Sequence, residues 1–169
     1  RRCWHYDWVV DMDIRAFFDS MDHELLMRAV RKHTQCQWML LYIERWLKAP
    51  VQLEDGTCLP RDKGTPQGGV ISPLLANLFL HYAFDKWMQR SHPNKPFERY
   101  ADDVIVHCKS EYAAKQVLRE IGQRMAECGL VLHPDKTKVV YCKDELRRRN
   151  YPETHFDFLG YRFQPRCAQ

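Results

Sequence analysis

The chain is 169 residues long, 45% of its residues are hydrophobic, and its formal net charge at pH 7 is +4. This size and composition predict one domain with a single buried core, and they exclude a repeat array, a low-complexity tract and a membrane-spanning segment. The excess of basic residues is mild, so it is compatible with a nucleic-acid partner without establishing one.

The seven cysteines bear on whether the protein holds zinc or disulfides and on its redox compartment. None of them forms a Cys-x-x-Cys pair, which argues against a structural zinc site, and an odd number does not fit a secreted disulfide framework. Because no signal peptide opens the sequence either, we expect a cytoplasmic protein with reduced thiols and no membrane partner.

The first half of the chain alternates strand and helix signals. Alternating apolar residues predict a strand from residue 8, which leads through a run of acids to a helix beginning near His23. A second amphipathic helix is expected over 37–47, and the apolar runs on either side of Gly56 predict a short hairpin. Ser72 and Pro73 are typical of a helix start, through a capping hydroxyl and a proline in the first turn, and this helix should continue to about residue 90.

The second half has the same mixture. Two runs rich in β-branched and aromatic residues, 97–100 and 104–107, predict a hairpin. An apolar stripe predicts a helix over 110–128 that ends at Gly129. Two further segments, 130–132 and 137–142, are expected to pair with each other as strands. The pattern predicts an α+β domain in which an antiparallel sheet is backed by helices.

The segment Tyr100-Ala101-Asp102-Asp103 is the most informative one, because it places two adjacent carboxylates at the tip of the 97–107 hairpin. Like charges repel unless a cation neutralises them, so the pair suggests a divalent metal site. Asp-Asp is also common in ordinary turns, where short polar side chains tolerate the backbone dihedrals. A third acid, Asp13, ends the first strand, and Asp11 lies two residues earlier on the same face. Carboxylate oxygens from neighbouring strands are ligands that Mg²⁺ prefers.

Five segments of the chain, in their order, resemble the palm motifs of the reverse transcriptases that group II introns encode. They are DIRAFFD at 13–19, GTPQGGVISPLLAN at 64–77, YADD at 100–103, LHPDKTK at 132–138 and FLGY at 158–161. One four-residue match is weak by itself, whereas five ordered matches span nearly the whole chain.

The resemblance implies a polymerase palm, with a ferredoxin-like or RRM-like core, as one domain over residues 1–169, with the fingers and thumb largely outside this segment. It also implies an RNA-directed DNA polymerase that adds deoxynucleotides (from dNTPs) to the 3′ end of a DNA or RNA primer on an RNA template. Two Mg²⁺ ions, for which Mn²⁺ can substitute, would serve this nucleotidyl transfer. The resemblance further implies a bacterial protein that acts in intron splicing and retrotransposition, with intron RNA as a partner.

The resemblance assigns the catalytic metal ions to three acids and one backbone oxygen. Asp13 and Asp102 are the expected direct ligands, and Asp103 is expected beside them. The backbone carbonyl of Ile14 is expected to add an oxygen ligand. Asp11 is expected to be a solvated or hydrogen-bonded neighbour.

The nucleotide and template contacts are also carried over from the resemblance. Phe18 is expected beneath the incoming sugar, where its ring would collide with a 2′-hydroxyl, although alternation along a strand leaves open whether Phe17 or Phe18 faces the site. Gln67 is expected to contact the incoming nucleotide or the template base. Gly68 and Gly69 would make room for the template strand.

A lysine and a hairpin complete the expected site. Lys136, or as a second choice Lys138, is expected near the triphosphate, where an ammonium group can neutralise or protonate the leaving pyrophosphate. Phe158, Leu159 and Gly160 resemble the hairpin that grips the primer terminus, although Phe158 would suit the core equally well.

Other functions fit parts of this pattern. An RNA-binding maturase scaffold without polymerase activity would be expected to have lost Asp13 or Asp102, and both are present. A two-metal nuclease could use the same acids, but it has no need for an aromatic gate at Phe18 or for a template-facing loop. A CRISPR-associated reverse transcriptase stays open, because the fusion that distinguishes it would lie outside this segment.

Overall fold

The main sheet of the protein has four antiparallel strands. The computed structural model describes residues 3, 5–52, 54–66, 68–143, 147 and 149–165. Strands β1 (Trp8–Met12), β4 (Phe97–Tyr100), β5 (Asp103–Cys108) and β6 (Lys138–Tyr141) pair in the order β4-β5-β1-β6. Helices connect β1 to β4 and β5 to β6, and a hairpin connects β4 to β5, which is the ferredoxin-like arrangement. The expected α+β palm fold is therefore confirmed.

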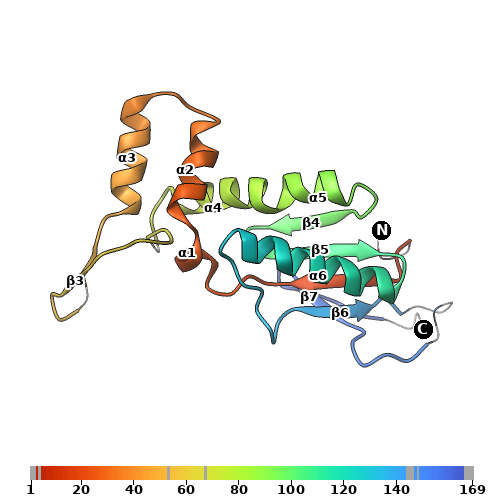
Figure 1. The fold of residues 1–169 in the computed structure, drawn as a ribbon. Helices are drawn as coiled ribbons and strands as arrows, with labels where there is room; N and C mark the ends of the chain where they lie inside the picture. The colour runs from red at the N-terminus through yellow and green to blue at the C-terminus, as the bar shows by residue number, and fades with distance from the viewer. Residues whose placement is uncertain are drawn as a thin grey trace.

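Six α-helices and two small hairpins surround this sheet in the described part of the chain. The helices are α1 (Phe17–Ser20), α2 (His23–Arg31), α3 (Gln37–Leu47), α4 (Ser72–Leu80), α5 (Lys86–Ser91) and α6 (Glu111–Glu127), and a π-helical segment, His81–Asp85, joins α4 to α5. Strand β2 (Val51–Gln52) pairs with β3 (Cys58–Leu59), and β7 (Phe156–Phe158) pairs with β8 (Tyr161–Phe163). Figure 1 shows α2 and α3 standing away from the sheet, while α4, α5 and α6 run alongside it. None of the helices in the described ranges is long and apolar enough to cross a membrane.

The core lies mainly on the face of the sheet that the helices cover. Alternate strand residues point into it, among them Val10, Met12, Val104 and Val106, and they pack with buried side chains of the helices. A second, smaller cluster on the opposite face consists of Val9, Ile105, Val140 and Phe156. The β7–β8 hairpin supplies Phe156, so it covers part of that second face.

Side-chain caps begin α2 and α6, but not α4. The Asp22 carboxylate accepts from the Leu25 amide at the start of α2, and the Ser110 hydroxyl accepts from the Ala113 amide at the start of α6. Ser72 was expected to cap α4, but it is already helical and its hydroxyl donates to the Pro66 carbonyl at 2.6 Å. Ser72 therefore ties the preceding glycine-rich loop to the helix instead of capping it.

The expected pairing of 130–132 with 137–142 is wrong. Strand β6 pairs with β1, with Lys138 opposite Asp11 and Tyr141 opposite Trp8. Leu132 forms an isolated antiparallel bridge with Ile14. Both segments therefore form their hydrogen bonds with residues 8–14, the segment that contains Asp11 and Asp13. These bonds hold the loop between the two segments beside the end of β1.

Candidate active site

Asp13 lies just beyond β1, where the chain leaves the sheet. The antiparallel bridge between Ile14 and Leu132 holds this point, through bonds from the His133 amide to the Asp13 carbonyl and from the Arg15 amide to the Val131 carbonyl, both at 2.9 Å. These two bonds do not involve the Ile14 carbonyl, whose role as an oxygen ligand stays a prediction. Asp13 is thus positioned by backbone bonds on both sides.

The chain is not extended after Asp13, so the alternation considered for Phe17 and Phe18 does not apply to them. Ala16 has a left-handed backbone conformation, with φ of 46°, and Phe17 begins the short helix α1. The side chain of Phe17 is 2% exposed and belongs to the core, whereas Phe18 is half-buried. This difference in burial favours Phe18 over Phe17 for the sugar contact, and the contact itself stays a prediction.

The YADD segment forms the tip of the β4–β5 hairpin, as expected. Ala101 turns the chain with φ of 52°, and Tyr100 pairs with Asp103, the first residue of β5. Met12 lies opposite Val104 in the antiparallel register, so Asp13 and Asp103 follow at the same level of adjacent strands. The acids from two distant parts of the sequence therefore meet at one end of the sheet.

A small cavity of about 240 Å³ opens at this end of the sheet. The expected site residues Asp13, Ile14, Phe18, Asp102 and Lys136 all line it. The remaining lining residues are Ala16, Phe17, Asp19 and His133. The structure thus brings two carboxylates, an aromatic ring and a lysine together around one cavity.

Acidic side chains outnumber the one lysine at this end of the sheet. The Lys136 ammonium lies 2.8 Å from an Asp13 carboxylate oxygen, and this hydrogen bond, with the charge of Asp13, raises the pKa of Lys136. Burial and repulsion from Asp102 and Asp13 raise the pKa of Asp103. Lys136 therefore supplies cationic charge to a group of acids that repel one another.

The acids are of the ligand type that binds a divalent cation, but they are not arranged around one ion position in the described residues. Within the ranges that the structure describes, no group of three His, Cys, Asp or Glu side chains is placed to hold one ion. Oxygen ligands and mutual repulsion are nevertheless what a Mg²⁺ or Mn²⁺ site requires, and Lys136 already occupies the position of a counter-charge on Asp13.

Asp11, expected to be a solvated or hydrogen-bonded neighbour of the acids, is only partly exposed to solvent. It is half-buried opposite Lys138 on β6, and burial is the main cause that raises its pKa to about 6. The Lys138 ammonium lowers the pKa, while Asp103, Asp157 and Asp13 raise it further. Burial and neighbouring acids thus disfavour the charged form of Asp11, and this residue does not line the cavity.

We expect Asp11→Asn to stabilise the metal-free protein at pH 8 by about 1 kcal/mol, after allowance for solvent screening. A carboxyl whose folded pKa is raised binds more protons in the folded state, so its contribution is favourable below the unfolded pKa and is lost as pH rises toward about 6. Urea unfolding in EDTA at pH 4, 6 and 8 measures this effect. The gain should vanish at the lowest pH and be absent for Asp135→Asn, an exposed acid; a pH-independent gain would contradict the explanation.

Three of the expected contacts belong to the glycine-rich loop before α4. Gln67 falls outside the described residues. Gly68 has φ of 76° and open space around its Cα, whereas a Cβ at Gly69 would meet the Trp46 ring at 2.5 Å. Gly69 therefore has a packing reason to be glycine, whereas Gly68 has open space beside it, and the template contact of both stays a prediction.

The remaining expected residues sort into two groups. Phe158, Leu159 and Gly160 form the end and turn of the β7–β8 hairpin, with left-handed φ at Leu159 and Gly160. Lys138 lies 4.0 Å from Glu153 and does not line the cavity, so the geometry favours Lys136. The primer-grip role of the hairpin stays a prediction.

Two residues that pattern reasoning missed support the site. His133 lines the cavity, and its backbone amide holds Asp13. Arg99 forms two bonds of 2.7 Å to the Asp85 carboxylate, donates to Asn77 Oδ1 at 2.9 Å and donates to the Ala101 carbonyl at 3.0 Å. Arg99 therefore links the YADD turn to α4 and to the π-helical segment that follows it. The only sequence signal for it is a basic residue directly before Tyr100.

Arg99→Lys is expected to lower the free energy of unfolding by about 2 kcal/mol or more, because one ammonium group cannot replace the bidentate bond and leaves Asp85 poorly paired. Urea unfolding measures the loss. Arg90→Lys, the same change at an exposed position of α5, should have little effect, and equal losses in the two variants would contradict the role of Arg99.

Comparisons with known proteins identify relatives of this chain. The family model described as "Reverse transcriptase (RNA-dependent DNA polymerase)" matches residues 1–163. Protein YkfC of Escherichia coli K12 is 30% identical over 92% of this chain and 46% of its own length. The group II intron-encoded protein LtrA of Lactococcus lactis is 40% identical over 84% of this chain and 22% of its own length. The chain therefore spans less than half of these curated relatives.

Solved structures share the fold at low sequence identity. An apo telomerase from Candida tropicalis, truncated from its C-terminal domain, superposes with a TM-score of 0.71 at 12% identity, over 93% of this chain and 34% of that chain. A Candida albicans telomerase bound to a fragment of telomeric RNA superposes with a TM-score of 0.65 at 17% identity, over 92% and 29% of the two chains. Together, the arrangement of the acids and the match over residues 1–163 establish that the chain belongs to the reverse transcriptase (RNA-dependent DNA polymerase) family.

Proposed function

We propose that residues 1–169 form the catalytic palm of an RNA-directed DNA polymerase of the group II intron type. The observation that carries the proposal is the cavity, which gathers Asp13, Phe18, Asp102 and Lys136 from three separate segments of the chain. Each of these residue types has a distinct task in nucleotidyl transfer, and a structural role alone gives no reason for their meeting around one open space.

The proposed metal ligands are Asp13, Asp102, Asp103 and the Ile14 carbonyl. Two bound divalent cations, Mg²⁺ or Mn²⁺, would supply the positive charge that activates a primer 3′-hydroxyl and neutralises a departing pyrophosphate. Asp13 is held from both backbone sides, and Asp102 is held by the tight turn that Arg99 braces. The chain thus orients its carboxylates before any substrate arrives.

The other side chains select and neutralise the nucleotide. Phe18 stands at the cavity wall, where its ring can exclude a 2′-hydroxyl from the sugar of an incoming dNTP. Lys136 is exposed and lies within reach of the acids, so it can transfer its charge from Asp13 to the triphosphate when the nucleotide binds. The proposed template contacts are Gln67, Gly68 and Gly69, and the proposed primer contacts are Phe158, Leu159 and Gly160.

Primer extension by the full-length protein tests this proposal, with an RNA template, a DNA or RNA primer, dNTPs and Mg²⁺. Stepwise extension on the RNA template is the expected result. Shortening of the primer would indicate a nuclease, and retained RNA binding without extension would indicate a scaffold that kept the palm only as a fold. Either result would overturn the proposal.

The similarity to LtrA supports intron RNA as a partner of the whole protein, which would act in splicing and retrotransposition. We propose that the fingers and thumb that complete the polymerase lie outside these 169 residues, in a cytoplasmic protein. Because such segments orient the triphosphate and the duplex, the isolated chain should extend primers poorly. Efficient, processive synthesis by residues 1–169 alone would contradict this division.

Lys136→Ala is expected to tighten Mn²⁺ binding about fivefold, because an ammonium group that competes for Asp13 is removed from a water-exposed position. The same variant should extend primers more slowly, because the lysine no longer assists the triphosphate. Titration of Mn²⁺ by electron paramagnetic resonance measures the affinity without turnover. Lys138→Ala is the matched control, and unchanged Mn²⁺ affinity in Lys136→Ala would contradict the pairing seen here.

A further inference from the structure

Two pockets adjoin at the end of the sheet that lies away from the acids. Trp8 begins β1 opposite Cys108, the last residue of β5, and Lys109 follows directly. The six residue-to-residue steps from Asp103 to Lys109 put this end about 20 Å from the YADD turn, at the usual rise of an extended strand. This end therefore lies well outside the cavity that holds the proposed catalytic residues.

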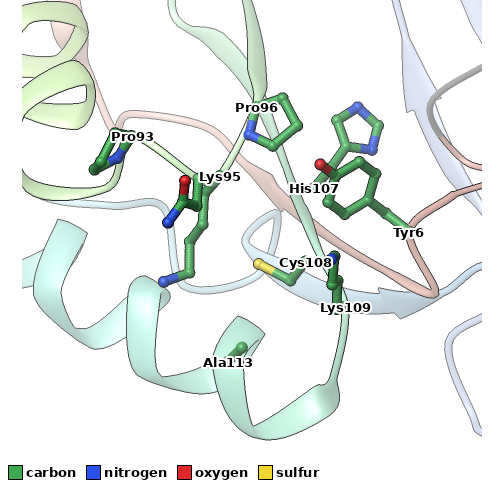
Figure 2. A pocket seen from close by; sticks show the side chains of 9 residues that line it. Tyr6, Pro93, Lys95, Pro96, His107, Cys108, Lys109 and Ala113 are labelled. Atoms are coloured by element: carbon green, nitrogen blue, oxygen red, sulfur yellow. The ribbon is translucent and has the colours of Figure 1, made fainter.

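The two pockets have similar size and share Lys109. The first, of about 620 Å³, includes Tyr6, Lys95, His107 and Lys109 in its wall. Figure 2 shows Tyr6 beside His107, and Lys95 extending toward α6. The second, of about 640 Å³, includes Lys109, Tyr112, Arg149 and Tyr151. We call this continuous region, defined by Tyr6, Lys95, Lys109, Tyr112, Arg149 and Tyr151, the distal surface.

The distal surface carries unneutralised positive charge. Lys95, Lys109 and Arg149 have no ion pair with any other described residue. The two acids in the second pocket are already engaged, since Asp7 lies 2.9 Å from Arg147 and Glu111 lies 2.6 Å from Lys115. An anionic partner would therefore meet three available cations without displacing an internal ion pair.

An exposed aromatic ring lies among these cations. Tyr112, in the first turn of α6, has 74% of its surface exposed. Behind it in the same pocket, Tyr151 packs against Trp8 and Tyr141 with ring centroids 4.6 and 4.7 Å apart, which forms a firm aromatic wall. Lysine is depleted at protein–protein interfaces, whereas cations alternating with stacking rings are typical of surfaces that bind single-stranded nucleic acid.

We propose that the distal surface binds a single-stranded segment of nucleic acid, with phosphates at Lys95, Lys109 and Arg149 and a base stacked on Tyr112. A single strand fits better than a duplex, because a duplex keeps its bases paired and unable to stack on a side chain. The contact does not depend on catalysis at Asp13 and Asp102, since no distal-surface residue lines that cavity. It would hold RNA or DNA strand that runs beyond the catalytic cavity.

Fluorescence anisotropy with an unstructured RNA of about 12 nucleotides tests the contact in EDTA, across roughly 50 to 200 mM salt. For Lys109→Ala/Arg149→Ala we expect about tenfold weaker binding and a salt dependence whose slope is smaller by about 1.4, the value for two lost phosphate contacts on a single strand. Tyr112→Ala should weaken binding roughly fivefold with the slope unchanged, and Tyr112→Trp should restore it.

The matched control is Arg28→Ala/Arg31→Ala, which removes two exposed charges from α2. An equal loss of affinity in this control, or no loss in the distal variants, would overturn the proposal. Primer extension on a short template should stay at the wild-type level in the distal variants, so failure of the distal contact and failure of the polymerase proposal give different results. Photo-crosslinking of 4-thiouridine RNA should label the peptide that contains Lys109 and Tyr112, and labelling confined to the catalytic cavity would also refute the contact.

Discussion

Asp102→Asn is expected to reduce primer extension by roughly 1000-fold or more, because it removes the charge of a direct metal ligand while it keeps the size of the side chain. Asp102 lines the cavity together with Asp13, and the turn at Ala101 fixes its position. Single-nucleotide incorporation under pre-steady-state conditions, with the full-length protein and Mg²⁺, measures the loss.

The control for this prediction is Asp62→Asn, which removes a carboxylate from an exposed position elsewhere in the chain. It should leave extension unchanged. Asp103→Asn should cause a smaller loss than Asp102→Asn, since Asp103 does not line the cavity. Substantial extension by the Asp102 variant, with normal RNA binding, would show that the acids at this turn do not serve catalysis.

Features decided by neighbouring residues were predictable from the sequence. The hairpin that carries Asp102 follows from a run with aromatic ends and a β-branched run, separated by a short polar turn. Helix α6 follows from its apolar stripe between Ser110 and Gly129. These signals depend on interactions within about ten residues, which a periodic pattern records directly. The ordered motifs added the meeting of Asp13 with Asp102, which no local pattern contains.

Features decided by distant partners were not predictable in the same way. The segments on either side of His133 have strand character, but nothing within them shows that they bond to Ile14 and β1 instead of each other. The role of Arg99 was unpredictable for the same reason. Its partners Asp85 and Asn77 are distant in the sequence, and the course of α4 and the π-helical segment brings them beside it. Tertiary hydrogen bonds override the local preference in both places.

The pair Phe17 and Phe18 shows where a correct pattern fails for a physical reason. Alternation requires an extended chain, and the left-handed turn at Ala16 ends that extension before either ring. Both rings border the cavity, but Phe17 is buried and packs into the core against Phe79, with ring centroids 6.4 Å apart, whereas Phe18 is only half-buried. The two neighbouring rings therefore have separable roles that one pair of substitutions can distinguish.

Phe18→Ala is expected to raise the incorporation of ribonucleotides relative to deoxynucleotides about tenfold or more, because the ring that collides with a 2′-hydroxyl is removed. The ratio of kcat/KM for a ribonucleotide and for its deoxy counterpart measures this change, and Phe18→Tyr should keep the wild-type ratio.

Phe17→Ala is the matched comparison, since it removes the same ring from the adjacent position. Because Phe17 is fully enclosed, its loss should lower the free energy of unfolding by roughly 3 to 5 kcal/mol and leave the sugar preference of the folded protein unchanged. A change in sugar preference for Phe17→Ala but not for Phe18→Ala would reverse the assignment and move the nucleotide to the other side of α1. The expected opposite result would assign the sugar contact to Phe18, the ring that the chain leaves half-buried after its left-handed turn at Ala16.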